Sequence, residues 1–188
     1  MTKSRTSRTT SKRAVPVTVA LALFLLTPAL LHAQSITVEK GKIEVTKGKI
    51  ESKGDVTVSG ALAPTLELGE AATLTLGDQA TLTIGDGGRI YTPSTTTAPV
   101  VTSEEPGNKF YTFVVASNGT FEVTALKIVS VDEDGLTLED GSVIPNNTVS
   151  GLTFDYVKSG ATSTALRFRH ATGTFTVSNN QFVVFLTH

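Results

Sequence analysis

The sequence contains no cysteine and no tryptophan, and only one methionine and three histidines occur among its 188 residues. Without cysteine the chain forms no disulfide, offers no thiolate nucleophile and provides no sulfur ligand for zinc. The three histidines (His32, His170 and His188) are too few for a histidine-rich metal site. The folded state must therefore be stabilised by hydrogen bonds and core packing rather than by disulfides.

The start of the chain has the pattern of a secretory signal peptide, which we assign to residues 1–33. Its basic residues are Lys3, Arg5, Arg8, Lys12 and Arg13. An apolar run from Val17 to Leu31 follows, and the small residue Ala33 precedes the polar Gln34. The apolar run is shorter than the roughly 20 residues of a spanning helix, although a retained signal anchor is the alternative. We expect a secreted or cell-surface protein without a transmembrane span after removal of the signal.

Removal of the leader changes the charge of the protein. It takes away five basic residues and leaves 11 basic and 17 acidic residues, a net charge of −6. An acidic surface does not favour nucleic acid, which binds through Lys and Arg contacts to phosphate. Residues 34–63 nevertheless carry a net charge of +1, and residues 64–188 carry −7. The lysines of the first segment either attract an anionic surface or a second copy, or protect strand edges from unwanted pairing.

Residues 34–91 contain short repeats with periods of seven and then eight residues. The units are Ile36–Lys42, Ile43–Lys49, Ile50–Asp55, Val56–Gly60, Pro64–Ala71, Ala72–Gln79 and Ala80–Gly87. Apolar residues alternate inside each unit, as Leu74 and Leu76 do with threonine between them. A glycine near the end of the unit supplies a turn, so each unit predicts one strand and one turn. Successive units either form antiparallel hairpins or, in groups of about 21 to 24 residues, turns of a parallel β-solenoid. The similar glycine corners favour the solenoid.

The composition changes in residues 92–108, where three prolines and many threonines and serines predict a linker or loop. In residues 109–188 a longer repeat follows, with Thr120–Val123 echoed by Thr174–Val177 and Gly135–Leu138 echoed by Ala165–Phe168. A spacing of roughly 25 to 30 residues suits one coil of a β-helix. The predicted fold is all-β, a parallel β-helix (β-solenoid) with short-period N-terminal coils and longer-period C-terminal coils.

The stretch from Asn118–Phe121 through Asp134–Leu138 to Thr174–Phe182 resembles the right-handed parallel β-helix repeats of secreted and surface proteins of bacteria. This resemblance implies an exported, non-enzymatic protein with a structural, adhesive or surface-matrix role. Polysaccharide lyases and pectin-cleaving hydrolases share this topology, so a small carbohydrate-binding or carbohydrate-active β-helix is an alternative. A trimeric segment like those of phage fibres is another.

Few residues are candidates for chemistry, and none is assigned a catalytic role. Asp132 and Asp134 alternate on one strand face, where they would offer oxygens to a calcium ion, the one cofactor considered, or form an ordinary solvated turn. Arg167 and Arg169 also share a face, and they either bind a carboxylated polysaccharide or pair with acids of the neighbouring coil. The apolar C-terminal run Phe182–Leu186 adds one more expectation, self-association through open strand edges.

Overall fold

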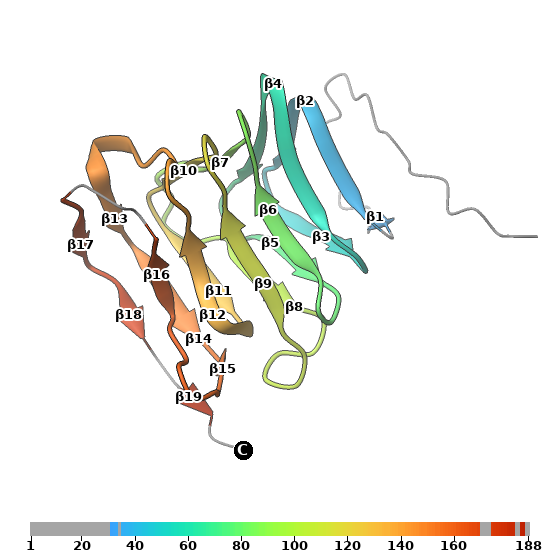
Figure 1. Cartoon of the computed structure of the whole chain (residues 1–188). Coiled ribbons are helices and arrows are strands. Elements are labelled where there is room, and N and C mark those ends of the chain that lie inside the picture. The colour runs from blue at the N-terminus through green and yellow to red at the C-terminus, as the bar shows by residue number, and fades with distance from the viewer. Residues whose placement is uncertain (1–30, 34, 170–173, 183–184, 187–188) are drawn as a thin grey trace, which may run out of the picture.

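The computed structural model describes residues 31–33, 35–169, 174–182 and 185–186. It is a parallel β-solenoid of about five turns, and the coils follow one another along the rod from the N-terminal to the C-terminal part (Figure 1). Within these ranges the one helical element is the 3₁₀ helix η1 (Pro145–Asn147). The prediction of an all-β solenoid is confirmed, and the hairpin alternative is wrong because the strand pairs are parallel.

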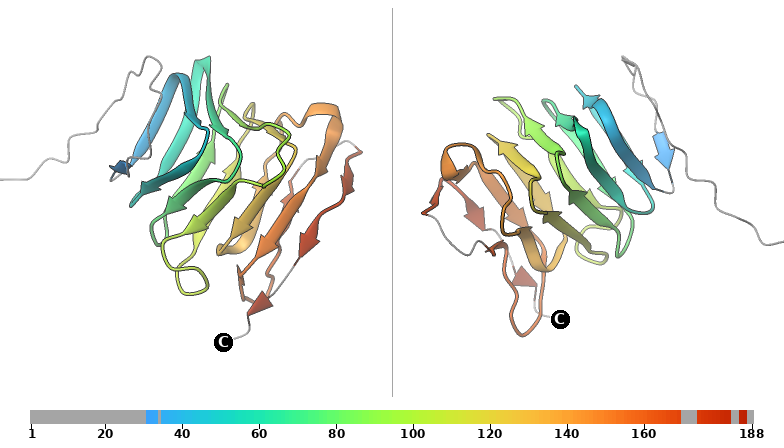
Figure 2. Two further views of the ribbon diagram at one scale, coloured as in Figure 1. Left: turned by 180° about the vertical axis from the view of Figure 1, so that it is seen from behind. Right: turned by 45° about the horizontal axis from the view of Figure 1, so that its top comes forward.

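Two large sheets run along the rod (Figure 2). The seven-stranded sheet has the order β1 (Leu31–Ala33), β3 (Gly48–Ser52), β5 (Ala72–Leu76), β8 (Val100–Ser103), β11 (Leu126–Val129), β14 (Leu152–Asp155) and β18 (Gln181–Phe182). The eight-stranded sheet has the order β10 (Thr120–Val123), β7 (Arg89–Thr92), β4 (Val56–Leu68), β6 (Thr81–Ile84), β9 (Tyr111–Val115), β12 (Val131–Leu138) and β16 (Leu166–Phe168), with β2 (Ile36–Val45) paired to β4. Two small sheets pair β13 (Thr148–Ser150) with β17 (Thr176–Ser178) and β15 (Val157–Lys158) with β19 (Phe185–Leu186).

Each coil has three sides. In the first coils one long strand forms two of them, as the pairing of β4 shows. Val56 of β4 pairs with β6, whereas Leu66 of the same strand pairs with β7. We call the seven-stranded sheet the first side. The second side contains the starts of β2 and β4 with β6, β9, β12 and β16, and the third side contains the ends of β2 and β4 with β7 and β10.

The coils differ in length, but they do not lengthen steadily along the rod. The step from Leu66 to its partner Ile90 spans fewer residues than the step from Leu82 to its partner Phe113, and the next step, from Phe113 to Leu136, is shorter again. The longer coil contains the segment 92–108, for which composition predicts a linker or loop. The structure differs from that prediction at Val100–Ser103, which is β8 and lies between β5 and β11. Its inward-facing Val101 is fully buried, so this strand continues the alternation of the core.

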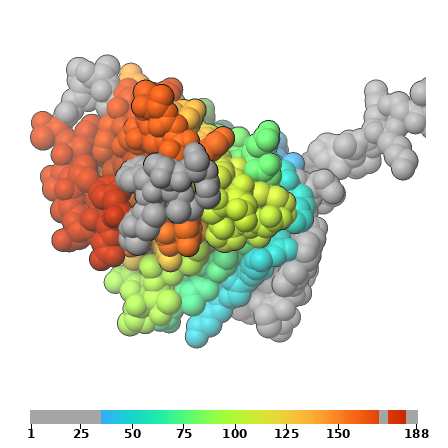
Figure 3. All heavy atoms as spheres, turned by 90° about the horizontal axis from the view of Figure 1, so that it is seen from below, coloured from blue at the N-terminus to red at the C-terminus, as the bar shows by residue number. Residues whose placement is uncertain are grey.

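Apolar side chains fill the interior in columns that run from coil to coil. On the first side the column contains Ile50, Leu74, Val101, Ile128 and Phe154, and on the second side it contains Val56, Leu82, Phe113 and Leu136. All of these side chains are at most 8% exposed. The hydroxyl of Tyr111, itself buried, donates a hydrogen bond to the carbonyl oxygen of Val101 at 3.1 Å and so links two sides. Interior packing of this kind matches the close-packed cores of folded proteins. Figure 3 shows one outer face of the molecule, where atoms of successive coils lie side by side.

The corners use residues that tolerate the left-handed backbone conformation. Asn118, Asn146, Asn147 and Asn179 all have φ between 49° and 58°, which asparagine adopts more readily than most residues. At another corner a Cβ on Gly88 would overlap the carbonyl oxygen of Val58 in the preceding coil. Glycine is therefore required there by close stacking of the coils rather than by φ.

One corner between the first and second sides is held by an ion-pair cluster. Glu104 contacts Lys53 and Lys109, and the Lys109 Nζ lies 2.7 Å from Glu104 Oε1. The hydrogen bonds from Lys109 and Lys53 lower the pKa of Glu104 from 4.5 to about 2. The cluster ties the loop after β8 to a coil that lies two turns earlier.

This cluster predicts a specific acid dependence of stability. A carboxylate whose pKa falls on folding contributes stability above its unfolded pKa, and the contribution is lost as the pH drops toward the folded pKa. The urea midpoint of the wild type should therefore exceed that of Glu104→Gln above a pH of about 4.5, and the two midpoints should converge as the pH falls toward about 2. A difference that is constant from neutral to strongly acidic pH would show that the charge of Glu104 is not involved.

Candidate functional site

The densest group of predicted site residues lies on the second side, where β12 bulges away from β9. Val131 pairs with Tyr111 and Leu136 pairs with Phe113, so five steps along β12 match two steps along β9. The residues between these pairs, 132–135, form the bulge. Gly135 ends it with φ +66°, and a Cβ at this position would overlap the carbonyl oxygens of Thr164 and Ala165.

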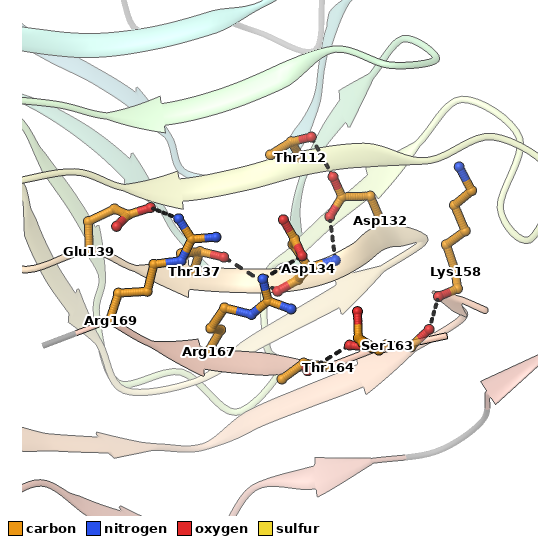
Figure 4. A network of polar contacts seen from close by, with 11 residues as sticks. Thr112, Asp132, Asp134, Thr137, Glu139, Lys158, Ser163, Thr164, Arg167 and Arg169 are labelled. Carbon is orange, nitrogen blue, oxygen red and sulfur yellow. Dashed lines mark hydrogen bonds and ion pairs between the residues drawn. The ribbon is translucent and has the colours of Figure 1, made fainter. Parts of the chain in front are cut away.

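The bulge holds Asp132 and Asp134 in different contacts (Figure 4). Asp132 is half-buried and accepts hydrogen bonds from the Thr112 hydroxyl at 2.5 Å and from the Asp134 backbone N–H at 3.2 Å. Burial raises the pKa of Asp132, and these two hydrogen bonds oppose the rise. Asp134 Oδ1 instead lies 2.6 Å from Arg167 Nη1 of the following coil.

Arg167 and Arg169 both extend from the β16 segment on the outer surface, as their spacing predicts. Arg169 Nη1 lies 3.1 Å from Glu139 Oε1, and so the two arginines contact two acids of the preceding coil. This is the pairing that we weighed against polysaccharide binding. The Arg169 side chain remains 47% exposed and the Arg167 side chain 25% exposed. Partly exposed ion pairs of this kind contribute about 1 kcal/mol or less to stability. A competing anion can therefore replace Asp134 or Glu139 as the partner of these guanidinium groups at a small cost in free energy.

The structure places Asp132 and Asp134 in one bulge, but their oxygens already have protein partners. Among the residues that the structure describes, no group of three histidine, cysteine or carboxylate side chains is arranged to hold a metal ion. The Arg167 guanidinium next to Asp134 takes the place that a cation would have beside this carboxylate. Calcium binding at this pair stays a prediction.

Calcium titration tests this arrangement through the melting temperature. In the wild type we expect no calcium-dependent rise, because the guanidinium of Arg167 neutralises Asp134. In Arg167→Gln the freed carboxylate of Asp134, together with Asp132, should make the melting temperature rise with calcium, and adding Asp134→Asn should abolish that rise. A calcium-dependent rise in the wild type that Asp132→Asn removes would contradict our expectation and establish a cation site.

Sequence reasoning missed the uncharged partners in this region. Thr112 contacts Asp132 from the neighbouring strand, and the Ser163 hydroxyl donates a hydrogen bond to the carbonyl oxygen of Lys158 at 2.9 Å (Figure 4). The Thr112 pairing depends on the register of two strands from successive coils, and the bulge shifts that register. No local motif in the sequence specifies the shift.

Comparison with protein-family models, with curated proteins and with solved structures finds no match to this chain.

The outer surface of the second side carries a ladder of threonine-sized side chains that ends in charge. In register from coil to coil it contains Thr37, Thr57, Thr83, Val114, Thr137 and Arg167, of which Thr137 is only 3% exposed. The threonines of the first coils therefore share one face, and the ion pairs of the bulge lie at its C-terminal end. Such a ladder is a flat, regular surface in which neighbouring strands lie about 4.8 Å apart.

The third side presents a second polar surface. Arg89 lies over the ring of Tyr91, 4.5 Å from its centroid, and its Nη2 is 2.6 Å from Glu122 Oε2. Two coils earlier Lys42 Nζ lies 2.6 Å from Glu67 Oε2. Ion pairs between coils therefore recur on this side as they do around β16. In the described ranges no helix is long and apolar enough to cross a membrane.

Proposed function

We propose that the chain is exported after removal of residues 1–33 and serves as a non-enzymatic structural or adhesive component at the cell surface. The observation that carries this proposal is the position of its polar groups. They form ladders along the outside of the rod, while apolar columns fill the inside. Long flat faces with repeated hydroxyl and charged groups suit contact with an extended surface.

Export is the first part of this proposal to test. Expression of the whole chain in a secreting bacterium, followed by N-terminal sequencing of the exported protein, should yield Gln34 as the first residue. A matched variant with Leu23→Arg and Leu26→Arg in the apolar run should stay inside the cell as the intact chain. Export of this variant, or retention of the wild type with its leader still attached, would remove the basis for an extracytoplasmic role.

A second candidate function, binding of a carboxylated polysaccharide, is favoured by the arginine pair at β16. Both side chains extend from the same segment at the edge of the sheet, on one face, and Arg169 is about half exposed. Retention on immobilised polygalacturonate in the absence of calcium should decrease in Arg167→Gln/Arg169→Gln and remain in Lys127→Gln, a matched cation on another side. Equal retention of the wild type and both variants would contradict this candidate. Release of reducing ends from the polymer would instead point to the carbohydrate-active alternative.

A further inference from the structure

The first strand of the seven-stranded sheet lies within the predicted leader. β1 pairs with β3 through Leu31 to Ile50 and Ala33 to Ser52, and it forms the N-terminal edge of the sheet. The predicted cleavage follows Ala33, so removal of the leader takes β1 with it. The edge of β3 then has unpaired backbone N–H and C=O groups, which form a template for another parallel strand.

The opposite end of the same sheet offers a strand of the required kind. β18 is the last described strand of the first side and pairs with β14 through Thr153 to Gln181 and Phe154 to Phe182. The Phe182 ring stacks on that of Phe154 with centroids 5.4 Å apart, yet its side chain is 54% exposed. β18 therefore has one paired edge and an apolar residue available for a further neighbour.

The order of the sides along the chain allows the two ends to join without a break. After removal of β1 the first strand is β2, on the second and third sides, and β3 follows on the first side. At the other end, among the described residues, β16 is the last strand of the eight-stranded sheet on the second side and β18 is the last strand of the first side. A second copy placed in line puts its β2 against β16 and its β3 against β18, with the strands still parallel.

The register shows which side chains this arrangement brings together. Phe182 continues the column of Phe154, Ile128, Val101, Leu74 and Ile50, so it would lie against Ile50 of the second copy at the register position of Leu31. On the second side the column of Phe168 leads through Leu138 and Val58 to Val38. The next residue in each strand places Arg169 beside Glu39, an attractive charge pair.

We propose that removal of the leader opens the edge of β3 and that β18 of a second copy takes the place of β1, so that processed chains join head to tail. This inference rests on the export step of the proposed function. The contact is heterologous, since two different ends meet, and repetition of it gives an open filament rather than a closed oligomer. β1 would act until cleavage as an intramolecular cover that prevents assembly inside the cell.

The test uses the whole chain with a recognition site for a specific protease inserted between Ala33 and Gln34. Before cleavage, sedimentation should show no large species. After cleavage the sedimenting mass should rise with time and concentration, and electron microscopy should show unbranched filaments. A processed chain that remains monomeric at the highest soluble concentration would overturn the proposal, and so would equal assembly before and after cleavage. A discrete trimer would instead support the phage-fibre alternative and also overturn it.

Matched variants identify the surfaces. Phe182→Lys should abolish filaments, because it places a charge in the apolar column, whereas Leu62→Lys, at a corner residue that is 70% exposed, should leave them unchanged. The Phe182→Lys chain keeps its β3 edge and should shorten wild-type filaments when mixed at low ratio, an effect that a misfolded chain would not produce. Filaments in Phe182→Lys would overturn the proposed contact. N-terminal sequencing of the exported chain is a separate result, so loss of the assembly proposal leaves the export proposal standing.

Discussion

Replacing Phe113 by alanine is expected to lower the free energy of unfolding by about 3–5 kcal/mol. The Phe113 side chain is fully buried in the column between Leu82 and Leu136. Its ring also meets the edge of Phe121, with centroids 6.3 Å apart and an interplanar angle of 64°. Truncation leaves a cavity at the middle of the rod, where neighbouring coils above and below limit relaxation. Urea unfolding followed by circular dichroism measures the loss.

The matched control for this prediction is the next residue of the same strand. Val114 faces outward in the threonine ladder and is only partly buried, so Val114→Ala should cost less than about 1 kcal/mol. Similar losses in Phe113→Ala and Val114→Ala would contradict the alternation of inward and outward side chains along β9.

Replacing Gly135 by alanine should cost more than about 2 kcal/mol. Gly135 combines a φ of +66° with close approach to the backbone oxygens of Thr164 and Ala165 in the next coil. A methyl group would both strain the backbone and force these oxygens away, and backbone atoms cannot rotate aside as a side chain can. The same displacement should weaken the ion pair of Arg167 with Asp134, because Arg167 lies on the strand that follows Thr164 and Ala165.

A substitution at Gly48 separates the cost of backbone strain from the cost of steric overlap. Its φ is +100°, but a Cβ there would have no neighbour within 4 Å. Gly48→Ala should therefore show only the conformational cost, about 1–2 kcal/mol, and the excess in Gly135→Ala measures the steric contact. Equal melting-temperature losses in the two variants would show that the segment 159–165 moves aside, and the steric part of the prediction would then be wrong.

The fold could be predicted from the sequence because the alternation within each repeat and the length of three repeats both match the geometry of a coil. Alternation in units such as Ala72–Gln79 marks inward and outward positions, and glycine marks the corners. Three such units make one coil, and this spacing matches the observed pairing of Leu66 with Ile90. The strand β8 was missed because prolines and threonines on both sides hide it. Its burial depends on the coils before and after it, which composition does not reveal.

The candidate site could be predicted only in part. The alternation of side chains along a strand places Arg167 and Arg169 on one face, as expected. Their partners Asp134 and Glu139 lie on the preceding coil, and the offset between partners changes within one strand because of the bulge. Thr112, which bonds to the half-buried Asp132, likewise reaches it from another coil. Such contacts depend on coil length, which the weak C-terminal repeat does not fix.

Because its coils are stacked, this molecule can change in length by whole turns during evolution. Each coil meets chiefly the coil before it and the coil after it, so duplication or deletion of one whole turn leaves most other contacts intact. Gene rearrangements that add or remove one full coil, such as the step from Leu66 to Ile90, would lengthen or shorten the rod while keeping all three sides aligned. A change of a few codons fits best at a corner or in a bulge like that of β12, because a shift by a single position inside a regular strand turns the core outward.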